Sequence, residues 1–334
     1  MQSHILKRTL TVSFILGVTL LIVVLFSLLV GTTNVGFMDL WNLDFHPVDY
    51  SKMYAVIFSY RLPRILLACI AGAGLASSGV VFQGVLRNPL ADPYIIGIAA
   101  GGALGAVTSI SLLKSDWLVS TSIASFVGSL IAVGLVYILA VLRKSAAYIN
   151  TVILAGIIVG SLMNAMMLLI MSVTSSNELQ RVLFWLMGDF SLADYDKIVF
   201  SGSIVLAGFL LIYLNANRLN LLVLDEESAS NLGVDVQKYR FILMTASALI
   251  TGAVVSVSGT IGFVGLVAPH SMRLLFGPDH RILLPTAFLG GALFLVVSDT
   301  VARLVAYPVE LPVGVITALS GGPFFLYLLL RNRN

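Results

Sequence analysis

Long runs of apolar residues, separated by short polar segments, follow one another along most of the chain. A helix needs about 20 apolar residues to cross a bilayer, and several of these runs reach that length. The runs do not alternate polar and apolar positions, as the strands of a membrane β-barrel do. The pattern predicts an all-α polytopic membrane protein with about ten transmembrane helices. The expected spans cover residues 9–30, 62–83, 94–112, 117–141, 150–173, 197–215, 240–258, 260–276, 282–303 and 311–330.

The composition supports the same class of protein. Of the 334 residues, 58% are hydrophobic and 10% are charged, against roughly 25% charged in a soluble domain. We expect one membrane domain over residues 1–334, with the run at 9–30 retained as a span rather than cleaved as a signal peptide. The net charge of +3 and the lack of a basic run argue against a nucleic-acid partner. Cys69 is the single cysteine, so no intrachain disulfide can form.

The positions of lysine and arginine predict the orientation, because short cytoplasmic loops are enriched in both residue types. With the N-terminus inside, twelve of these residues fall on the inner side and seven on the outer side, which favours cytoplasmic N- and C-termini. The inner residues are Lys7, Arg8, Arg87, Arg143, Lys144, Arg218, Lys238, Arg240, Arg273, Arg281, Arg331 and Arg333. The outer residues are Lys52, Arg61, Arg64, Lys114, Arg181, Lys197 and Arg303.

Arg61, Arg64 and Arg303 each stand at the outer end of a span, against the usual bias. One interpretation is structural: the side chains reach the interface, or form a local ion pair such as Asp299 with Arg303 at i, i+4. The other is that they form a basic outer surface that attracts an acidic partner. The sequence leaves both open.

Two polar loops interrupt the inner side. In QGVLRNPLADPYIIG, at 83–97, the pairs Asn88-Pro89 and Asp92-Pro93 predict a tight turn, with Asp92 capping the next helix. The segment 217–238 is the longest polar stretch, but it also carries several leucines and valines. Capping residues Asp225 and Gly233 indicate short helices there. We interpret it as an amphipathic helical pair that offers an apolar face to a cytoplasmic partner.

Methionines recur at helical spacing in SLMNAMMLLIMSV, at 161–173. Such a stripe is most often ordinary packing, although a flexible, polarizable wall for a bulky solute is the alternative. Asn164 lies in the same span, and an amide there normally faces protein or water rather than lipid.

The chain lacks the motifs of an energy-converting enzyme. It contains no G-x-x-x-x-G-K-[ST] and no H-E-x-x-H, and its four histidines show no zinc-site spacing. His270 is expected to be a satisfied structural residue. Among the sixteen acidic residues only Asp299 falls inside a predicted span, near its end. An ion-coupled carrier usually needs a carboxylate near the midplane, so the sequence indicates transport without an energy source of its own.

Several long motifs, in order, resemble the FecCD-type permeases, the membrane subunits of ABC importers for iron-siderophores, haem and cobalamin. They are RLPR at 61–64, ASSGVVFQGVLRNPLADPYIIGIAAGGALGA at 76–106, LDEESASNLGV at 224–234, SGTIGFVGLVAPHSMRLLFGPDHRILLP at 258–285, and DTVARL with ELPVG within 299–314. The resemblance covers nearly the whole chain. It implies a ten-helix permease in the cytoplasmic membrane of a bacterium or archaeon.

The resemblance also implies partners and a mechanism. The permease is expected to form a homodimer, with two ATPase subunits on the cytoplasmic side and a solute-binding protein docking outside. ATP and magnesium would bind the ATPase chains; this chain would bind no metal and no cofactor and would not be an enzyme. Solute would cross between the two copies by alternating access. The cargo would be an iron chelate, ferric siderophore or haem, or cobalamin; the alternative function is an ion-coupled secondary transporter.

The resemblance assigns roles to four groups of residues. The coupling contacts to the ATPase would be Leu222, Leu224, Asp225, Glu226, Ala229, Leu232 and Gly233. Docking of the binding protein would use Arg61, Arg64 and Arg303. The translocation pathway would be lined by Met163, Asn164, Met167, Met171, Leu311 and Pro312. The cytoplasmic loop or gate would contain Asn88, Pro89, Asp92 and Pro93.

Overall fold

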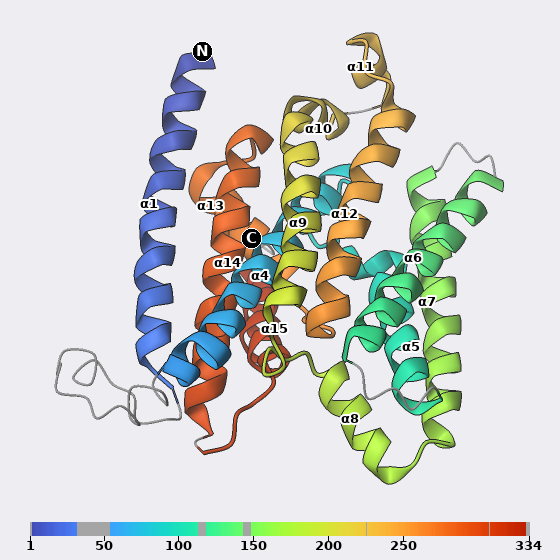
Figure 1. Ribbon diagram of the computed structural model, residues 1–334. Coiled ribbons are helices and arrows are strands. Elements are labelled where there is room, and N and C mark those ends of the chain that lie inside the picture. Colours follow the sequence, from blue (N-terminus) through green and yellow to red (C-terminus); the bar gives the residue numbers. More distant parts are fainter. Residues whose placement is uncertain are drawn as a thin grey trace.

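The computed structural model describes residues 2–31, 54–112, 118–142, 148–224, 226–306 and 308–331, and in these residues the regular structure is helical throughout (Figure 1). Within these described ranges, seven helices are long and apolar enough to cross a membrane, and three shorter apolar helices accompany them. The long helices are α1 (Gln2–Leu29), α4 (Leu62–Val85), α6 (Leu118–Leu142), α7 (Tyr148–Ser172), α9 (Tyr195–Leu214), α12 (Val236–Ser258) and α14 (His280–Val305). The shorter apolar helices are α5 (Ile98–Ser111), α13 (Val264–Phe276) and α15 (Val313–Arg331).

These ten apolar helices fall on the ten expected spans, so the predicted fold class is confirmed. Two spans begin four residues later than expected, whereas α1 and α12 begin seven and four residues earlier. The span expected from residue 94 begins with a 3₁₀ turn, Pro93–Ile96, and α5 follows only after Gly97, whose φ is +79°. The span expected from residue 260 begins at Val264, because residues 259–263 are not helical and Gly259 and Phe263 both have positive φ.

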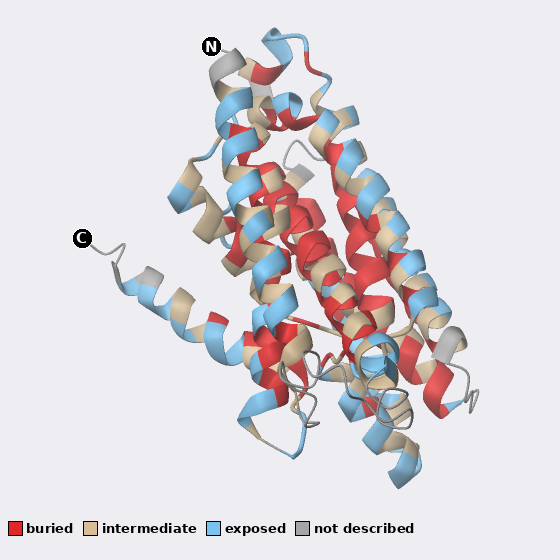
Figure 2. Ribbon diagram, turned by 60° about the vertical axis from the view of Figure 1, so that its left-hand side comes forward, coloured by how far each residue is buried: buried red, intermediate tan, exposed pale blue. Residues whose placement is uncertain are grey.

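The centre of the bundle is the antiparallel pair α4 and α14. A π-helical stretch, Ala55–Arg61, leads directly into α4, and in the most apolar part of Ala55–Val85, 83% of the residues are buried, against 6% for α1 at the edge. Figure 2 shows the buried residues gathered in the inner helices, with exposed residues along the outer ones. At the crossing, a Cβ placed on Gly72 would lie 2.2 Å from the Gly291 carbonyl oxygen, and one on Gly291 would lie 2.3 Å from the Gly72 oxygen. Glycine is therefore required on both helices for the backbones to meet.

The segment 217–238 forms two short helices, as expected. Helix α10 (Ala216–Leu222) and helix α11 (Glu226–Asn231) lie at the end of the bundle where α1 begins (Figure 1). Gly233 ends α11 with φ +80° and donates to Ser230 O, while Val234 N donates to Ala229 O. This pair of bonds is a Schellman cap, which needs a left-handed residue at Gly233. Asp235 follows this cap and caps the long helix α12 by accepting from Lys238 N.

One helix, α8 (Ser176–Leu186), was not predicted from the sequence. It lies at the opposite end of the bundle from α10 and α11 (Figure 1). Its start carries the S-x-x-E pattern of a capping box, and Ser175 Oγ donates to Glu178 Oε2 at 2.8 Å. Val182 is buried against α5, whereas Leu183 and Phe184 are exposed. Eleven residues are too few to span a bilayer, so α8 lies within one end of the bundle.

The Gly72–Gly291 crossing generates a stability prediction. Gly72→Ala should lower the free energy of unfolding by about 1–3 kcal/mol, because the added methyl would push the α4 backbone away from Gly291. Gly134→Ala in α6 is the matched control, since nothing lies within 4 Å of its added Cβ. That control should leave stability unchanged or raise it by up to about 1 kcal/mol through helix propensity. Thermal unfolding of both purified variants in detergent measures the difference; equal midpoints would contradict the close crossing.

Candidate functional site

Polar residues gather at both ends of the α4–α14 pair. Because the two helices are antiparallel, the start of α4 meets the end of α14, and the end of α4 meets the start of α14. We call the first place the Arg303 end and the second the α10 end. The N-terminal part of α1 belongs to the α10 end, since Arg8 donates to the carbonyl of Phe276, the last residue of α13.

At the Arg303 end, a buried carboxylate holds two guanidinium groups. Arg64 Nε donates to Asp299 Oδ1 at 2.8 Å, and Arg303 Nε lies 3.2 Å from Asp299 Oδ2. Arg64 also pairs with Glu310 through Nη1 and lies 3.7 Å from Asp189. The Asp299 side chain is 1% exposed, whereas Glu310 is 35% exposed. Arg64 Nε is hydrogen-bonded to Asp299, whereas Arg303 Nε and Asp299 Oδ2 are held as an ion pair without a hydrogen bond, so opposite charge offsets part of the cost of burying this cluster.

The same arginines bind the end of α1. Arg303 Nη1 donates to Val30 O at 3.0 Å, and Arg61 Nη1 donates to Leu28 O at 2.8 Å. Ser27 completes the contact by a 2.8 Å hydrogen bond to Thr300. The last carbonyls of a helix have no partner within it, and the negative end of its dipole attracts cations. The arginines therefore fasten α1 to α4 and α14.

This geometry bears on the two interpretations of Arg61, Arg64 and Arg303. Their relative exposures are 6%, 6% and 3%, and the expected Asp299–Arg303 ion pair at i, i+4 is present. The local ion-pair interpretation thus describes their positions in this chain. Docking of an acidic partner stays a prediction, and Glu310 and Asp189 are the more exposed acids that such a partner would meet first.

At the α10 end, the side chain of Asn220 joins α10 to the start of α14. Its Oδ1 accepts from the backbone N of His280 at 2.9 Å and lies 2.7 Å from His280 Nδ1. Its Nδ2 donates to Asp279 Oδ1 at 2.9 Å. Asp279 also binds Arg281 through both carboxylate oxygens. The hydrogen bonds from Arg281, with a smaller contribution from Asn220, hold the pKa of Asp279 at about 2.

The turn predicted within 83–97 forms a loop at 86–97, after the end of α4, and lies beside this contact. Arg87 has φ +50° and donates from Nε and Nη2 to Leu222 O, 3.2 Å from each, at the end of α10. Asn88 and Pro89 are exposed, while Pro93 is buried. Asp92 caps the 3₁₀ turn by accepting from Tyr94 N at 2.8 Å, as expected. Burial raises the pKa of Asp92 to about 6, and the bond from Tyr94 opposes that rise.

The structure divides the expected coupling residues into two groups. Leu222 and Ala229 are buried, whereas Leu224 and Leu232 are exposed by 47% and 62%. Nothing lies within 4 Å of a Cβ added to Gly233. Asp225 lies outside the described residues, and so does the side chain of Glu226. The exposed leucines are the members that a partner chain could contact directly.

The expected pathway residues are also divided. Met163 is buried in the main core, and Met167 and Met171 pack against Val107, Ile110 and Val182. These three methionines therefore fill space between helices within this chain, whereas Met166 of the same stripe is exposed. Asn164, by contrast, is exposed on α7.

On the other predicted pathway segment, Leu311 N donates to Ala302 O and Pro312 is buried. These residues fasten the start of α15 to the end of α14. The pathway roles given to both segments stay predictions.

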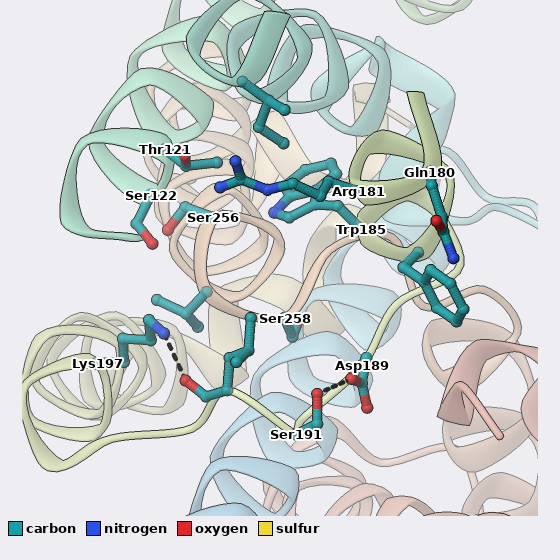
Figure 3. Close-up of a pocket in the computed structure, with 14 residues that line it drawn as sticks. Thr121, Ser122, Gln180, Arg181, Trp185, Asp189, Ser191, Lys197, Ser256 and Ser258 are labelled. Atoms are coloured by element: carbon teal, nitrogen blue, oxygen red, sulfur yellow. Dashed lines mark hydrogen bonds between the residues drawn. The ribbon is translucent and has the colours of Figure 1, made fainter. Parts of the chain in front are cut away.

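A cavity of about 410 Å³ opens beside α8 at the Arg303 end (Figure 3). It is lined by Ile110, Thr121, Ser122, Gln180, Arg181, Phe184, Trp185, Asp189, Ser191, Leu192, Lys197, Ser256, Val257 and Ser258. Lys197 Nζ donates to Leu192 O and pairs with Asp194, and Ser191 donates to Asp189. Ser191 also lines a second cavity of about 320 Å³ that contains the three arginines. None of the expected pathway residues lines either cavity: the walls of the first come from α5, α6, α8, α9, the end of α12 and the loop after α8, and those of the second mainly from the π-helical stretch, α4 and α14.

His270 departs from the expectation of a satisfied side chain. Its Nδ1 is buried and forms no hydrogen bond in the described part of the chain, and its ring centroid lies 6.2 Å from those of Phe324 and Phe325. The ring therefore joins α13 to α15 by packing. Among the described residues, no group of three histidine, cysteine or acidic side chains is placed to hold a metal ion.

The chain is similar to known proteins over most of its length. The model of the FecCD transport family matches residues 19–331. The hemin transport system permease protein HmuU of Yersinia pestis is 39% identical over 95% of this chain and 96% of its own length. The cobalamin import system permease protein BtuC of Halobacterium salinarum is 43% identical over 83% of this chain and 74% of its own. A solved metal-chelate type ABC transporter in an inward-facing conformation is 34% identical and superimposes with a TM-score of 0.85, covering 96% of this chain and 99% of that one.

The ion cluster at the Arg303 end predicts a large loss of stability on removing its central charge. Asp299→Asn should lower the free energy of unfolding by about 3–5 kcal/mol, because two buried guanidiniums lose their shared carboxylate. Asp196→Asn, the same substitution at an exposed site on α9, should change it by less than about 0.5 kcal/mol. Thermal unfolding in detergent separates the two; a midpoint for Asp299→Asn equal to that of Asp196→Asn would refute the role given to Asp299.

Asp92 predicts a dependence of stability on pH. Because the pKa of Asp92 is raised in the folded chain, its protonated form stabilises the fold. This contribution to the free energy of unfolding is fully present below about pH 4 and is lost as the pH rises through about 6. Asp92→Asn keeps a cap oxygen for Tyr94 N without a charge to bury. The variant should therefore be more stable than the unaltered chain at pH 7.5, by at most about 3 kcal/mol, and equal to it near pH 4. A difference that is the same at both pH values would show that Asp92 is not the titrating group.

Proposed function

The chain belongs to the FecCD transport family, and we propose that it is the transmembrane subunit of an ABC importer for an iron chelate or cobalamin. The observation that carries this proposal is the similarity over almost the whole chain to permeases of hemin and cobalamin import systems. The ten apolar helices account for the membrane-spanning part. The iron chelate, ferric siderophore or haem, is ranked first by the frequency of such cargo in the family.

The ATP-hydrolysing subunits are proposed to be separate chains that bind at the α10 end. The sequence holds no P-loop motif of its own. In the segment of α10 and α11, the side chains of Val223, Leu224 and Leu232 are exposed. The segment follows the end of the apolar helix α9, so these side chains are not needed for contact with lipid. Exposed apolar side chains on a short helical pair suit the groove of a partner protein. The α10 end is then cytoplasmic, together with the N-terminus.

Two copies of the chain are proposed to enclose the pathway. Asn164 is exposed within the apolar helix α7, and Ser320 is exposed within α15. Polar groups inside apolar helices face protein or water rather than lipid, so both faces suit a second copy or an aqueous path. Among the described residues, α15 packs mainly on α13 and α14, which leaves its other side available.

A solute-binding protein is proposed to dock at the Arg303 end. Its acidic groups would compete with Glu310 for Arg64, because Glu310 is the most exposed carboxylate in that cluster. Cargo released there would meet the α8 cavity, whose walls combine aromatic rings with hydroxyl and charged groups. ATP binding would close the ATPases, move α10 and α11, and switch the pathway from outward-open to inward-open.

The alternative of an ion-coupled carrier has less support. Such a carrier needs a carboxylate that can exchange protons or bind a cation along its path. Asp299 lies near the end of α14 and is held by Arg64 and Arg303, so its charge is already neutralised. In the described residues, no other acidic side chain lies within a long apolar helix beyond its first turn.

Leu224→Arg and Leu232→Arg test the proposed ATPase surface. Both side chains are exposed, so the substitutions should leave the permease folded while placing a charge in the apolar contact. Copurification with the ATPase should fall by at least about tenfold for either variant, since burying an unpaired charge in an apolar contact is strongly unfavourable. Leu90→Arg is the matched control, because Leu90 is exposed in the neighbouring loop at 86–97.

Each outcome of that test is informative. Loss of the ATPase in the Leu224 and Leu232 variants, with Leu90→Arg unaffected, supports the α10–α11 surface. Full assembly and full ATP-driven uptake in both variants would place the ATPase elsewhere. Loss with all three would extend the ATPase contact to the loop at 86–97.

A further inference from the structure

The hydrogen bonds between Asn220 and the start of α14 can form in only one orientation of the Asn220 amide. A backbone N–H can only donate, so the atom of Asn220 that meets His280 N must be the carbonyl oxygen. A carboxylate can only accept, so the atom that meets Asp279 must be the amide nitrogen. Both neighbours therefore fix the same orientation of the amide. The side chain cannot turn over without losing both bonds.

The His280 ring is fixed in the same way. Asn220 Oδ1 is an acceptor, so Nδ1 of His280 carries the hydrogen across the 2.7 Å contact. Nε2 is buried without a hydrogen bond to any described residue and lies 3.2 Å from the position of a Cβ on Gly84 of α4. His280 is 5% exposed and is thus enclosed by α4, α10 and α14. We call Asn220, Asp279 and His280 the α10 latch.

A second attachment joins α10 to α4. Arg87 follows α4 and donates twice to the Leu222 carbonyl, which is at the C-terminal end of α10 and has no helical partner. Leu219 and Leu222 are 0% and 2% exposed, and Leu219 lies beside Gly84. Helix α10 is therefore held to the start of α14 by the bonds of Asn220, and to the end of α4 by the bonds of Arg87 and by apolar packing of Leu219.

The central helices continue this connection to the other end of the bundle. Gly72 and Gly291 bring the α4 and α14 backbones into contact, and Arg64 and Asp299 join the same two helices at the Arg303 end. Packed backbones of this kind move as a unit, since interiors are close-packed and transmit strain. A displacement of α10 is thus passed to α4 and α14 rather than absorbed at their ends.

We infer that Asn220 is a positioning residue that transmits the movement of α10 to α14 during transport, acting through His280 and Asp279. This inference rests on the proposed function and adds the residue by which the coupling segment acts on the membrane helices. The solvent-exposed face of α10 and α11 binds the ATPase, and the face of α10 that carries Asn220 passes the movement to α14. The two sides of α10 thus have separable roles.

Asn220→Ala tests the latch, with Asn217→Ala as its matched control. Asn217 is the same residue type in the same helix and is exposed. Each variant is reconstituted with the ATPase and binding protein, and both ATP hydrolysis and solute uptake are measured. Asn220→Ala should assemble and hydrolyse ATP to within about twofold of the unaltered complex, but the solute taken up per ATP should fall about tenfold, a typical size for coupling between sites. Asn217→Ala should keep the normal ratio.

Two results would overturn the inference. An uptake-to-hydrolysis ratio for Asn220→Ala equal to that of Asn217→Ala would show that the latch transmits nothing. Loss of ATPase assembly would show that Asn220 only shapes the binding surface. Failure of the unaltered complex to assemble or transport would instead refute the proposed importer, which keeps the two ideas distinguishable.

A covalent replacement provides the second test. In a Cys69→Ala background, Asn220→Cys with His280→Cys removes the latch, and a short thiol-reactive crosslinker restores the connection between α10 and α14. The reduced protein should show the low ratio of uptake to hydrolysis, and crosslinking should raise it toward that of the unaltered complex. If α10 must instead slide over α14, crosslinking would abolish uptake, and the inference would be wrong.

Discussion

The contact of Gly72 with Gly291 is the constraint on which the rest of the structure depends. Any side chain at either position would place its Cβ within about 2.3 Å of the facing carbonyl oxygen, so α4 and α14 can meet only where both residues are glycine. This contact makes two long apolar helices into one central body and leaves the remaining helices to pack around it. Because lipid offers no hydrophobic drive for association, close backbone packing of this kind is the main stabilising contact available inside a membrane.

The polar clusters follow from that central pair. The antiparallel crossing brings Arg64 to Asp299 at one end and Gly84 to His280 at the other. At the first end, arginine side chains bind the carbonyls at the end of α1, and a backbone hydrogen bond from Leu311 to Ala302 holds the start of α15. At the second, a fixed amide holds α10. Both clusters are networks within one chain, yet each stands next to a surface that a partner is proposed to use. A permease without an energy source of its own needs such a connection between its two faces.

The sequence predicted the number and approximate place of the apolar helices, because span length and turn chemistry are local properties. Asp92 and Gly233 were placed at helix ends for the same reason, and both lie there. The partners of Arg61 and Arg64 could not be predicted, since they come from segments more than thirty and more than two hundred residues away. The α10 latch was missed although Asp-His-Arg at 279–281 lay within a recognised motif, because its partner Asn220 belongs to another loop. The capping pattern at Ser175 could have revealed α8.

Uptake by vesicles that contain this chain measures the central claim most directly. The vesicles are loaded with ATP and carry the permease alone or together with its ATPase, and binding protein charged with ferric siderophore, haem or cobalamin is added outside. We predict uptake of one of these solutes only when ATPase, binding protein and ATP are all present, with hydrolysis stimulated by the charged binding protein. Uptake driven by an ion gradient through the permease alone, with no ATPase bound, would contradict the account and make the chain a secondary transporter.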